Sequence, residues 1–177
     1  MRELSASHDA AANGALGRLT PAQIDTALRR AGAVALRAMA LGRHPFGALL
    51  LAPDGDTVLA EQGNIDTVNH AESTLARQAA SSWPGAYLAG CTLVTTFEPC
   101  AMCAGTIYWS GIGHVLYGAD ETALLALTGD HPDNPTLALP CRQVFASGQR
   151  AVGVTGPVPA LADALAAPHR DFWRRAG

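Results

Sequence analysis

The chain has 177 residues, a length that suits one domain with a hydrophobic core. Apolar residues make up 49% of it, but no apolar run approaches the roughly 20 residues that a membrane-spanning helix needs. The net charge is −3, and the 12 basic residues, all arginine, are scattered along the chain. The composition therefore argues against a membrane protein and against a protein that grips a polyanion through a basic stripe.

The first part of the chain, residues 1–19, is rich in small and polar residues without a clear period. We expect these residues to form a flexible leader, and residues 20–177 to form a single domain. The leader has no apolar stretch of the kind found in secretory signal peptides, so we expect the protein to be cytoplasmic.

A helix followed by a hairpin is predicted next. Thr20 and Pro21 are typical of a helix N-cap and first helical position, and apolar residues then recur at helical spacing until Gly42. Two apolar runs, 47–52 and 57–62, flank a Pro-Asp-Gly-Asp turn and predict two antiparallel strands.

The rest of the chain alternates helical and strand patterns. We expect helices at 70–82, 100–109 and 141–147, strands at 90–96, 115–117 and 151–155, a lid-like segment with a short helix at 120–140, and a C-terminal helix. Strands separated by helices pair in parallel, with the helices packed on the faces of the sheet. The pattern therefore predicts an α/β fold.

Two cysteines and a histidine have the spacing of a metal site. Cys100 and Cys103 lie in Pro-Cys-Ala-Met-Cys at a predicted helix start, and His70 begins the predicted helix His-Ala-Glu about thirty residues earlier. Three such ligands leave one tetrahedral position open for water, as in catalytic zinc sites. Glu72 is well placed to take a proton from that water. We therefore expect one Zn²⁺ per chain, with Glu72 as the proton-transferring residue.

Each part of this pattern has a simpler explanation when taken alone. A Cys-x-x-Cys pair also occurs in redox sites and in structural zinc knuckles. A histidine at a helix start is commonly a packing residue, and a glutamate in the first turn commonly complements the helix dipole.

The two parts together, His-x-Glu followed by Pro-Cys-x-x-Cys, form the signature of zinc deaminases. On these residues the chain resembles the cytidine/deoxycytidylate deaminase superfamily, nearest to its guanine, cytosine and tRNA-adenosine deaminases. The resemblance covers roughly residues 20–155. It implies a three-layer α/β/α fold with a mixed five-stranded sheet, hydrolytic deamination of a heterocycle with release of ammonia, and a homodimer.

The resemblance also implies substrate contacts. Asn64 matches a substrate-orienting asparagine or is an ordinary turn residue, and the Ala71 and Cys100 amides would lie beside the reacting ring. Glu98 matches the Glu-Pro-Cys variant of guanine and tRNA-adenosine deaminases, and its role is either to support the site or structural. Phe46 has either a stacking role against a flat base or a core role.

Near the C-terminus, Phe172 and Trp173 resemble the terminal aromatic residues that close the pocket of yeast-type cytosine deaminases. Asp171 would then contact a ring nitrogen. Helix packing explains these residues equally well. His131 lies in the predicted lid, and Cys91 and Cys141 are expected to be buried free cysteines.

The predicted partner is a small heterocyclic substrate together with water, with no nucleic acid and no membrane. We expect a free nucleobase, with guanine or isocytosine ahead of cytosine. Two alternatives remain open: a tRNA-adenosine deaminase, which the missing basic stripe disfavours, and a zinc-bound scaffold without turnover.

Overall fold

The computed structural model describes residues 19–129 and 131–175, which contain one mixed sheet. Its strands, in the spatial order β2–β1–β3–β4–β5, are β1 (Gly47–Leu51), β2 (Val58–Gly63), β3 (Thr92–Phe97), β4 (His114–Ala119) and β5 (Gly153–Thr155). Strand β1 pairs antiparallel with β2 and β3, whereas β3, β4 and β5 pair in parallel. The predicted hairpin and the predicted parallel pairing are both confirmed.

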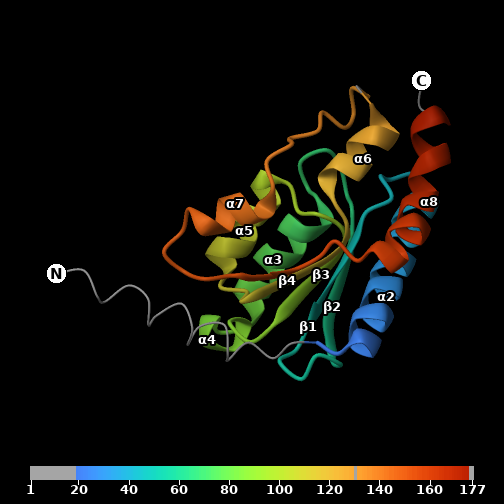
Figure 1. Cartoon of the computed structure of the whole chain (residues 1–177). Helices are drawn as coiled ribbons and strands as arrows, with labels where there is room; N and C mark the ends of the chain where they lie inside the picture. The colour runs from blue at the N-terminus through green and yellow to red at the C-terminus, as the bar shows by residue number, and fades with distance from the viewer. Residues whose placement is uncertain (1–18, 130, 176–177) are drawn as a thin grey trace.

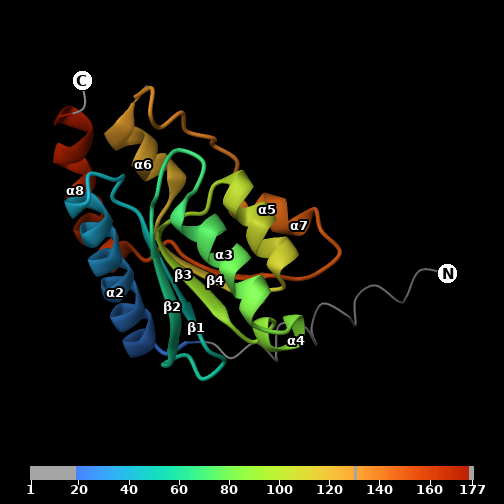
Figure 2. The same ribbon diagram turned by 180° about the vertical axis from the view of Figure 1, so that it is seen from behind.

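Helices cover both faces of the sheet. They are α2 (Pro21–Ala40), α3 (Ala71–Ser82), α4 (Gly85–Leu88), α5 (Ala101–Ser110), α6 (Glu121–Thr128), α7 (Cys141–Ala146) and α8 (Pro159–Arg175). Helices α2 and α8 lie on one face, and α3 and α5 lie on the other, with α7 beside α5 (Figures 1 and 2). This arrangement confirms the expected three-layer α/β/α fold.

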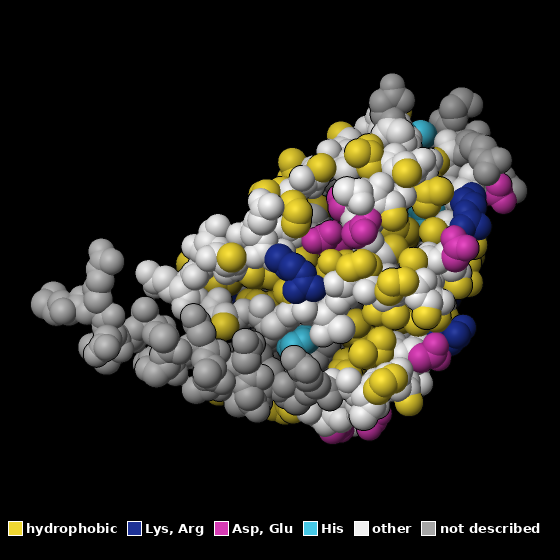
Figure 3. All heavy atoms as spheres, viewed as in Figure 1, with side chains coloured by type: hydrophobic (Ala, Val, Ile, Leu, Met, Phe, Trp, Pro, Cys, Tyr) yellow, Lys and Arg dark blue, Asp and Glu magenta, His cyan; other side chains and the backbone are white. Residues whose placement is uncertain are grey.

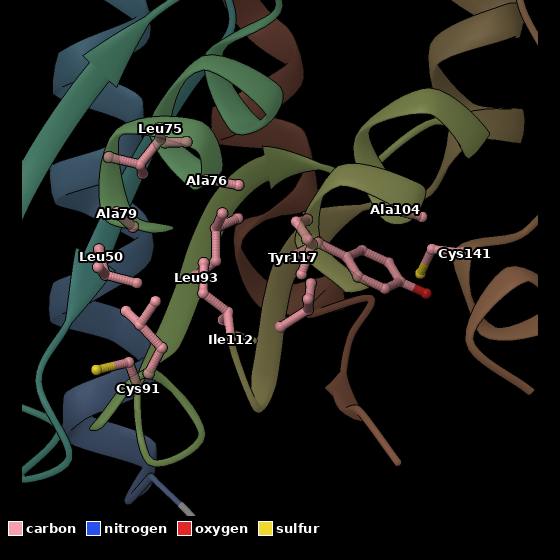
Figure 4. Close-up of a cluster of buried hydrophobic side chains, with 14 of the residues drawn as sticks. Leu50, Leu75, Ala76, Ala79, Cys91, Leu93, Ala104, Ile112, Tyr117 and Cys141 are labelled. Atoms are coloured by element: carbon pink, nitrogen blue, oxygen red, sulfur yellow. The ribbon is translucent and has the colours of Figure 1, made fainter. Parts of the chain in front are cut away.

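Each face of the sheet has its own hydrophobic core. The larger core lies between the sheet and helices α3 and α5, and Figure 4 shows Leu50, Leu75, Leu93 and Ile112 meeting there. The second core joins the opposite face to α2 and α8 through residues such as Leu28, which is fully buried. Cores on both faces explain why the residues of β1 and β3 are all buried.

Helix α2 crosses β1 at very short range. A Cβ atom at Gly47 would lie 2.4 Å from the Ala31 carbonyl oxygen, so any larger residue would push the helix away. The helix begins with a capping box in which Thr20 and Gln23 satisfy each other's backbone N–H groups, as the sequence predicted for Thr20.

Several boundaries differ from the predicted ones. Helices α3 and α5 begin one residue later than expected, so His70 and Cys100 are N-cap residues with extended backbone. The short helix α4 was not predicted, because Pro84 and Gly85 indicated only the end of the preceding helix; Pro84 is instead the N-cap of α4. The predicted 120–140 segment contains α6 followed by a loop that leads to α7.

The predicted leader, residues 1–19, falls outside the described residues except for Leu19. Within the described parts of the chain, no helix is both long and apolar enough to cross a membrane. The described cysteines carry free thiols, and Cys91 and Cys141 are buried, as expected.

Candidate metal centre and substrate pocket

The three predicted metal ligands converge at the N-termini of α3 and α5. The ligand atoms of His70, Cys100 and Cys103 all lie within 4.8 Å of one another. His70 Nδ1 is 3.7 Å from Cys100 Sγ and 3.5 Å from Cys103 Sγ. Zinc bonds of about 2.3 Å to sulfur and about 2.0 Å to nitrogen, at tetrahedral angles, separate sulfur from nitrogen by about 3.5 Å. The three side chains therefore fit a zinc ion.

The other ring nitrogen of His70 fixes the orientation of the imidazole. Nε2 lies 3.1 Å from the Thr67 carbonyl oxygen, so it carries the proton and leaves Nδ1 for a metal. The loop that presents this carbonyl is shaped by Asp66, whose carboxylate accepts hydrogen bonds from the backbone N–H groups of Val68 and Asn69. The β2–α3 loop thus supports the metal ligand.

The electrostatics of the three ligand groups favour a thiolate. Hydrogen bonds from Cys103 and His70 lower the pKa of Cys100 to about 4 against the opposing effect of burial. The same contact with Cys100 raises the pKa of His70 to about 9. Cys100 is also the N-cap of α5, where the unpaired backbone N–H groups favour negative charge.

Glu72 lies beside the three ligands. Its Oε2 is 3.7 Å from Cys103 Sγ, and its Oε1 accepts a hydrogen bond of 2.7 Å from the Thr95 hydroxyl. The side chain is buried, with 5% exposure. Burial raises the pKa of the Glu72 carboxyl, and the hydrogen bond from Thr95 opposes this effect. One carboxylate oxygen is thus held by the sheet, and the other faces the ligands.

A small pocket opens next to this carboxylate. It is lined by Phe46, His70, Glu72, Phe97, Glu98, Cys100, Glu121, Leu124 and Asn134. The rings of Phe46 and Phe97 meet edge to face at 6.0 Å, and with Leu124 they form an apolar wall. The pocket therefore combines an apolar, aromatic wall with carboxyl groups.

Glu98 lines this pocket, but the backbone engages both of its oxygens. Oε1 accepts a hydrogen bond of 2.9 Å from Cys141 N, and Oε2 accepts a longer one of 3.5 Å from Glu121 N. Glu98 therefore ties the first residues of α6 and α7 to the end of β3. Its observed contacts hold the 120–140 segment in place, which is the structural role that the sequence left open.

The other predicted substrate residues lie at different distances from the pocket. Phe46 lines it directly. Asn64 is buried beside it at the end of β2, and its Nδ2 donates to the Asp66 carbonyl, which leaves Oδ1 as the acceptor of this amide. Ala71 is fully buried in the first turn of α3.

The C-terminal aromatic residues pack behind the pocket wall and do not line the pocket. Trp173 is buried, and its Nε1 donates to His169 Nδ1. The ring of His44 contacts both Phe172 and Trp173, and His169 in turn packs against Phe46. Asp171 is exposed. These contacts agree with the helix-packing explanation, although His131 of the predicted lid also contacts Trp173 at 5.1 Å.

Four pocket residues were not predicted: Phe97, Glu121, Leu124 and Asn134. Parallel pairing of β3 with β4 sets Phe97 opposite Ala119, so the residues that follow both strands meet at one edge of the sheet. Ligands of α/β proteins commonly bind at this carboxyl edge. The acidic pair Asp120 and Glu121, which follows a strand that neighbours β3, was the signal that could have indicated Glu121.

Comparison with known proteins agrees with this geometry. Residues 21–119 match the family described as the cytidine and deoxycytidylate deaminase zinc-binding region. The chain belongs to this family. The protein is accordingly a zinc-dependent deaminase, and the cluster of His70, Cys100 and Cys103 has the donor atoms and the spacing to hold the zinc ion.

Its relatives include deaminases of different substrates. A probable cytosine deaminase of Schizosaccharomyces pombe is 33% identical over 150 residues, which span 82% of this chain and 90% of the relative. The guanine deaminase of Bacillus subtilis is 38% identical over 103 residues, 53% of this chain and 65% of the relative. A tRNA-specific adenosine deaminase of Haemophilus influenzae is 36% identical over 99 residues, 53% of this chain and 57% of the relative.

Solved structures show the same fold. The guanine deaminase of Nitrosomonas europaea superposes with a TM-score of 0.65 at 22% identity, covering 93% of this chain and 91% of the other. A protein solved in complex with 8-azaguanine superposes with a TM-score of 0.67 at 22% identity, covering 92% and 99%. At this identity the likeness establishes the architecture alone.

Proposed function

We propose that this deaminase converts the C–NH₂ group of a free nucleobase, of the guanine or isocytosine type, into C=O with release of ammonia. The observation that carries the proposal is the position of Glu72. Its carboxylate lies between the three metal ligands and a pocket with an aromatic wall. A proton-transferring group there reaches both the metal site and a flat ring bound in the pocket.

Each residue of the site then has a role. His70, Cys100 and Cys103 hold zinc, which when bound supplies Lewis-acid activation of water. Glu72 takes the first proton of the attacking water at Oε2 and delivers it to a ring nitrogen. It then takes the second proton, from the hydroxyl group on the ring carbon, and delivers it to the amine, which leaves as ammonia as the C–N bond breaks and C=O forms. Thr95 holds Oε1 and so keeps the carboxylate in one orientation.

The lining of the pocket supports a bare heterocycle as substrate. Phe46, Phe97 and Leu124 offer an apolar surface against which a planar ring packs. In the proposed complex the Asn64 amide, fixed by its bond to Asp66, orients the ring. The guanine and cytosine deaminases among the relatives support a free base as the class of substrate.

A tRNA substrate is the second candidate, because tRNA-specific adenosine deaminases are similar to this chain. RNA binding needs a basic surface along the phosphate backbone. The arginine side chains on the face shown in Figure 3 lie apart from one another, and acidic side chains gather near the start of α6. These charges favour a small substrate without phosphates.

We also propose that the protein is cytoplasmic and forms a homodimer. Trp109 on α5 is 86% exposed, the largest exposure among the large apolar side chains of the described residues. Such a residue is typical of an interface between subunits. Light scattering tests this assembly, because the molecular mass in solution should be that of a dimer for the wild type and lower for Trp109→Arg.

An ammonia-release screen tests the proposed reaction. The panel contains guanine, isocytosine, cytosine, adenine, their nucleosides, and a tRNA anticodon stem-loop. Turnover of a free base with little turnover of the stem-loop supports the proposal. Turnover of the stem-loop alone would reverse the ranking of the two candidates.

A further inference from the structure

Glu121 places a third carboxyl group in the pocket. It is the first residue of α6, separated from the end of β4 by the N-cap Asp120, and its side chain lines the pocket together with Glu72 and Glu98. Its backbone N–H donates to Glu98 Oε2, which anchors this first turn of α6 to the end of β3. The position of Glu121 is therefore set by the parallel β3–β4 pair.

The protein itself makes little use of the Glu121 carboxylate. Among the side chains of residues 19–129 and 131–173, none donates a hydrogen bond to it or forms an ion pair with it. The helix cap is supplied by Asp120, whose Oδ1 accepts from Ala123 N and from the Thr122 hydroxyl. Glu121 is thus a partly buried acid whose hydrogen-bonding capacity is available to a ligand.

Holding an acid at this place is costly. Burial raises the pKa of Glu121 to about 7, and the nearby Cys100, Glu72 and Glu98 add to the effect. A glutamate in the first turn of a helix can simply complement the helix dipole, but a solvent-exposed side chain would do so without this cost. The cost is offset when a ligand brings an N–H group to the carboxylate.

The balance of charge in the pocket restricts the ligand further. Its lining contains three carboxyl groups and neither arginine nor lysine. The charge of a zinc ion is matched by the two thiolates that hold it, so the metal does not reverse this balance. A phosphate group next to the base would therefore meet negative charge and no cation.

We propose that Glu121 is a specificity-determining residue that accepts a hydrogen bond from a ring N–H of the base and disfavours ligands that carry a phosphate. The inference rests on the proposed function, because it assumes that a base occupies the pocket. Lactam bases such as guanine and isocytosine present ring N–H donors. A nucleoside monophosphate contains the same ring but also carries a phosphate group with about two negative charges.

The test compares Glu121→Gln and Glu121→Ala with the matched control Asp120→Asn, which removes a neighbouring charge but keeps a good N-cap. Each change is made in zinc-loaded Glu72→Gln protein, where binding of guanine, isocytosine and guanosine 5′-monophosphate is measured by calorimetry without turnover. The steady-state KM and kcat of the same Glu121 and Asp120 variants are measured with Glu72 intact. Zinc content and circular dichroism confirm that each variant is loaded and folded.

We expect Glu121→Ala to weaken binding of the two bases about tenfold or more, the usual effect of losing a hydrogen bond to a charged group. Glu121→Gln should lower the ratio of the affinity for guanine to the affinity for guanosine 5′-monophosphate by about tenfold. Both variants should raise KM more than they lower kcat, and Asp120→Asn should behave as the wild type.

Two results would overturn the inference. The first is that both Glu121 variants bind the bases as tightly as the protein with Glu121. The second is that the Glu121 variants lose zinc as well as base binding, which would indicate that Glu121 has a structural role. If the protein with Glu72 intact releases ammonia from no base, the proposed function fails instead. The two failures are thus distinguishable.

Discussion

The Thr95 hydroxyl donates a hydrogen bond of 2.7 Å to Glu72 Oε1 and so joins strand β3 to the first turn of α3. Both side chains are buried, with exposures of 0% and 5%. A buried carboxylate without a donor would be free to rotate and costly to charge. This bond therefore fixes the direction in which Glu72 Oε2 faces the metal ligands.

Replacing Thr95 by valine should remove this constraint while keeping the size of the side chain. A hydrogen bond to a charged group contributes about 1.5–3 kcal/mol, so we expect kcat to fall by roughly 10- to 100-fold. Zinc content should stay as in the wild type. Thr92→Val, on the same strand, is the control, and a similar loss of kcat there would contradict the specific role of Thr95.

Zinc binding should depend on Cys103 and not on the other buried cysteines. Serine at position 103 offers a poor ligand in place of a thiolate, so the purified variant should contain almost no zinc by mass spectrometry. Cys91→Ala serves as the control, because Cys91 is equally buried but lies outside the ligand cluster. Full zinc content in the Cys103→Ser variant would refute the proposed ligand set.

Replacing Glu98 by alanine should loosen the 120–140 segment. The change removes the acceptor for Cys141 N and Glu121 N, and we expect the free energy of unfolding to drop by about 1–3 kcal/mol. Urea unfolding measures the stability, and limited proteolysis reports on the segment itself. The exposed Asp133 provides the control as Asp133→Asn. A Glu98 variant as stable and as protease-resistant as this control would contradict the holding role.

His169 should make the fold sensitive to acid. Burial, only partly offset by the Pro45 carbonyl, lowers the pKa of His169 to about 4 from an ordinary value near 6.5. Between these pH values the unfolded chain binds a proton that the folded protein does not, so stability falls as the pH drops from about 6.5 to about 4. The shift corresponds to at most about 3 kcal/mol.

The measurement compares unfolding free energies of the wild type and His169→Gln across this pH range. The variant keeps an acceptor for Trp173 Nε1 but does not titrate, so its profile should be flatter. Glu121, whose pKa is raised to about 7, contributes with the opposite sign in both proteins and cancels in the difference. Parallel profiles would show that His169 does not carry the effect.

Cys100 and Cys103 could be predicted as metal ligands from the sequence because they lie at the start of one helix, where residue spacing decides which side chains share a turn. His70 begins another helix, and it could be joined to the cysteines through the zinc-deaminase signature. The sheet was predictable for a similar reason, since apolar runs and turn residues repeat along the chain. The predicted element order required no knowledge of distant contacts.

The rest of the pocket depends on contacts between distant segments. Thr95 looks like any β-branched strand residue, and only the packing of α3 on β3 brings it to Glu72. Glu121 resembles an ordinary first-turn acid until the register of β3 with β4 places it beside Glu98. The C-terminal aromatic residues were ambiguous because a helix can present them to a pocket or to a core, and Trp173 packs in the core.

The most direct test of this account is ammonia release by Glu72→Gln protein loaded with zinc. Glutamine keeps the size of the side chain but cannot accept and return a proton, so deamination of the best free base should fall by about 10²- to 10⁴-fold. Zinc content and folding should equal those of the wild type. Ammonia release at the wild-type rate by this zinc-loaded variant would contradict the central claim that Glu72 transfers the protons of the reaction.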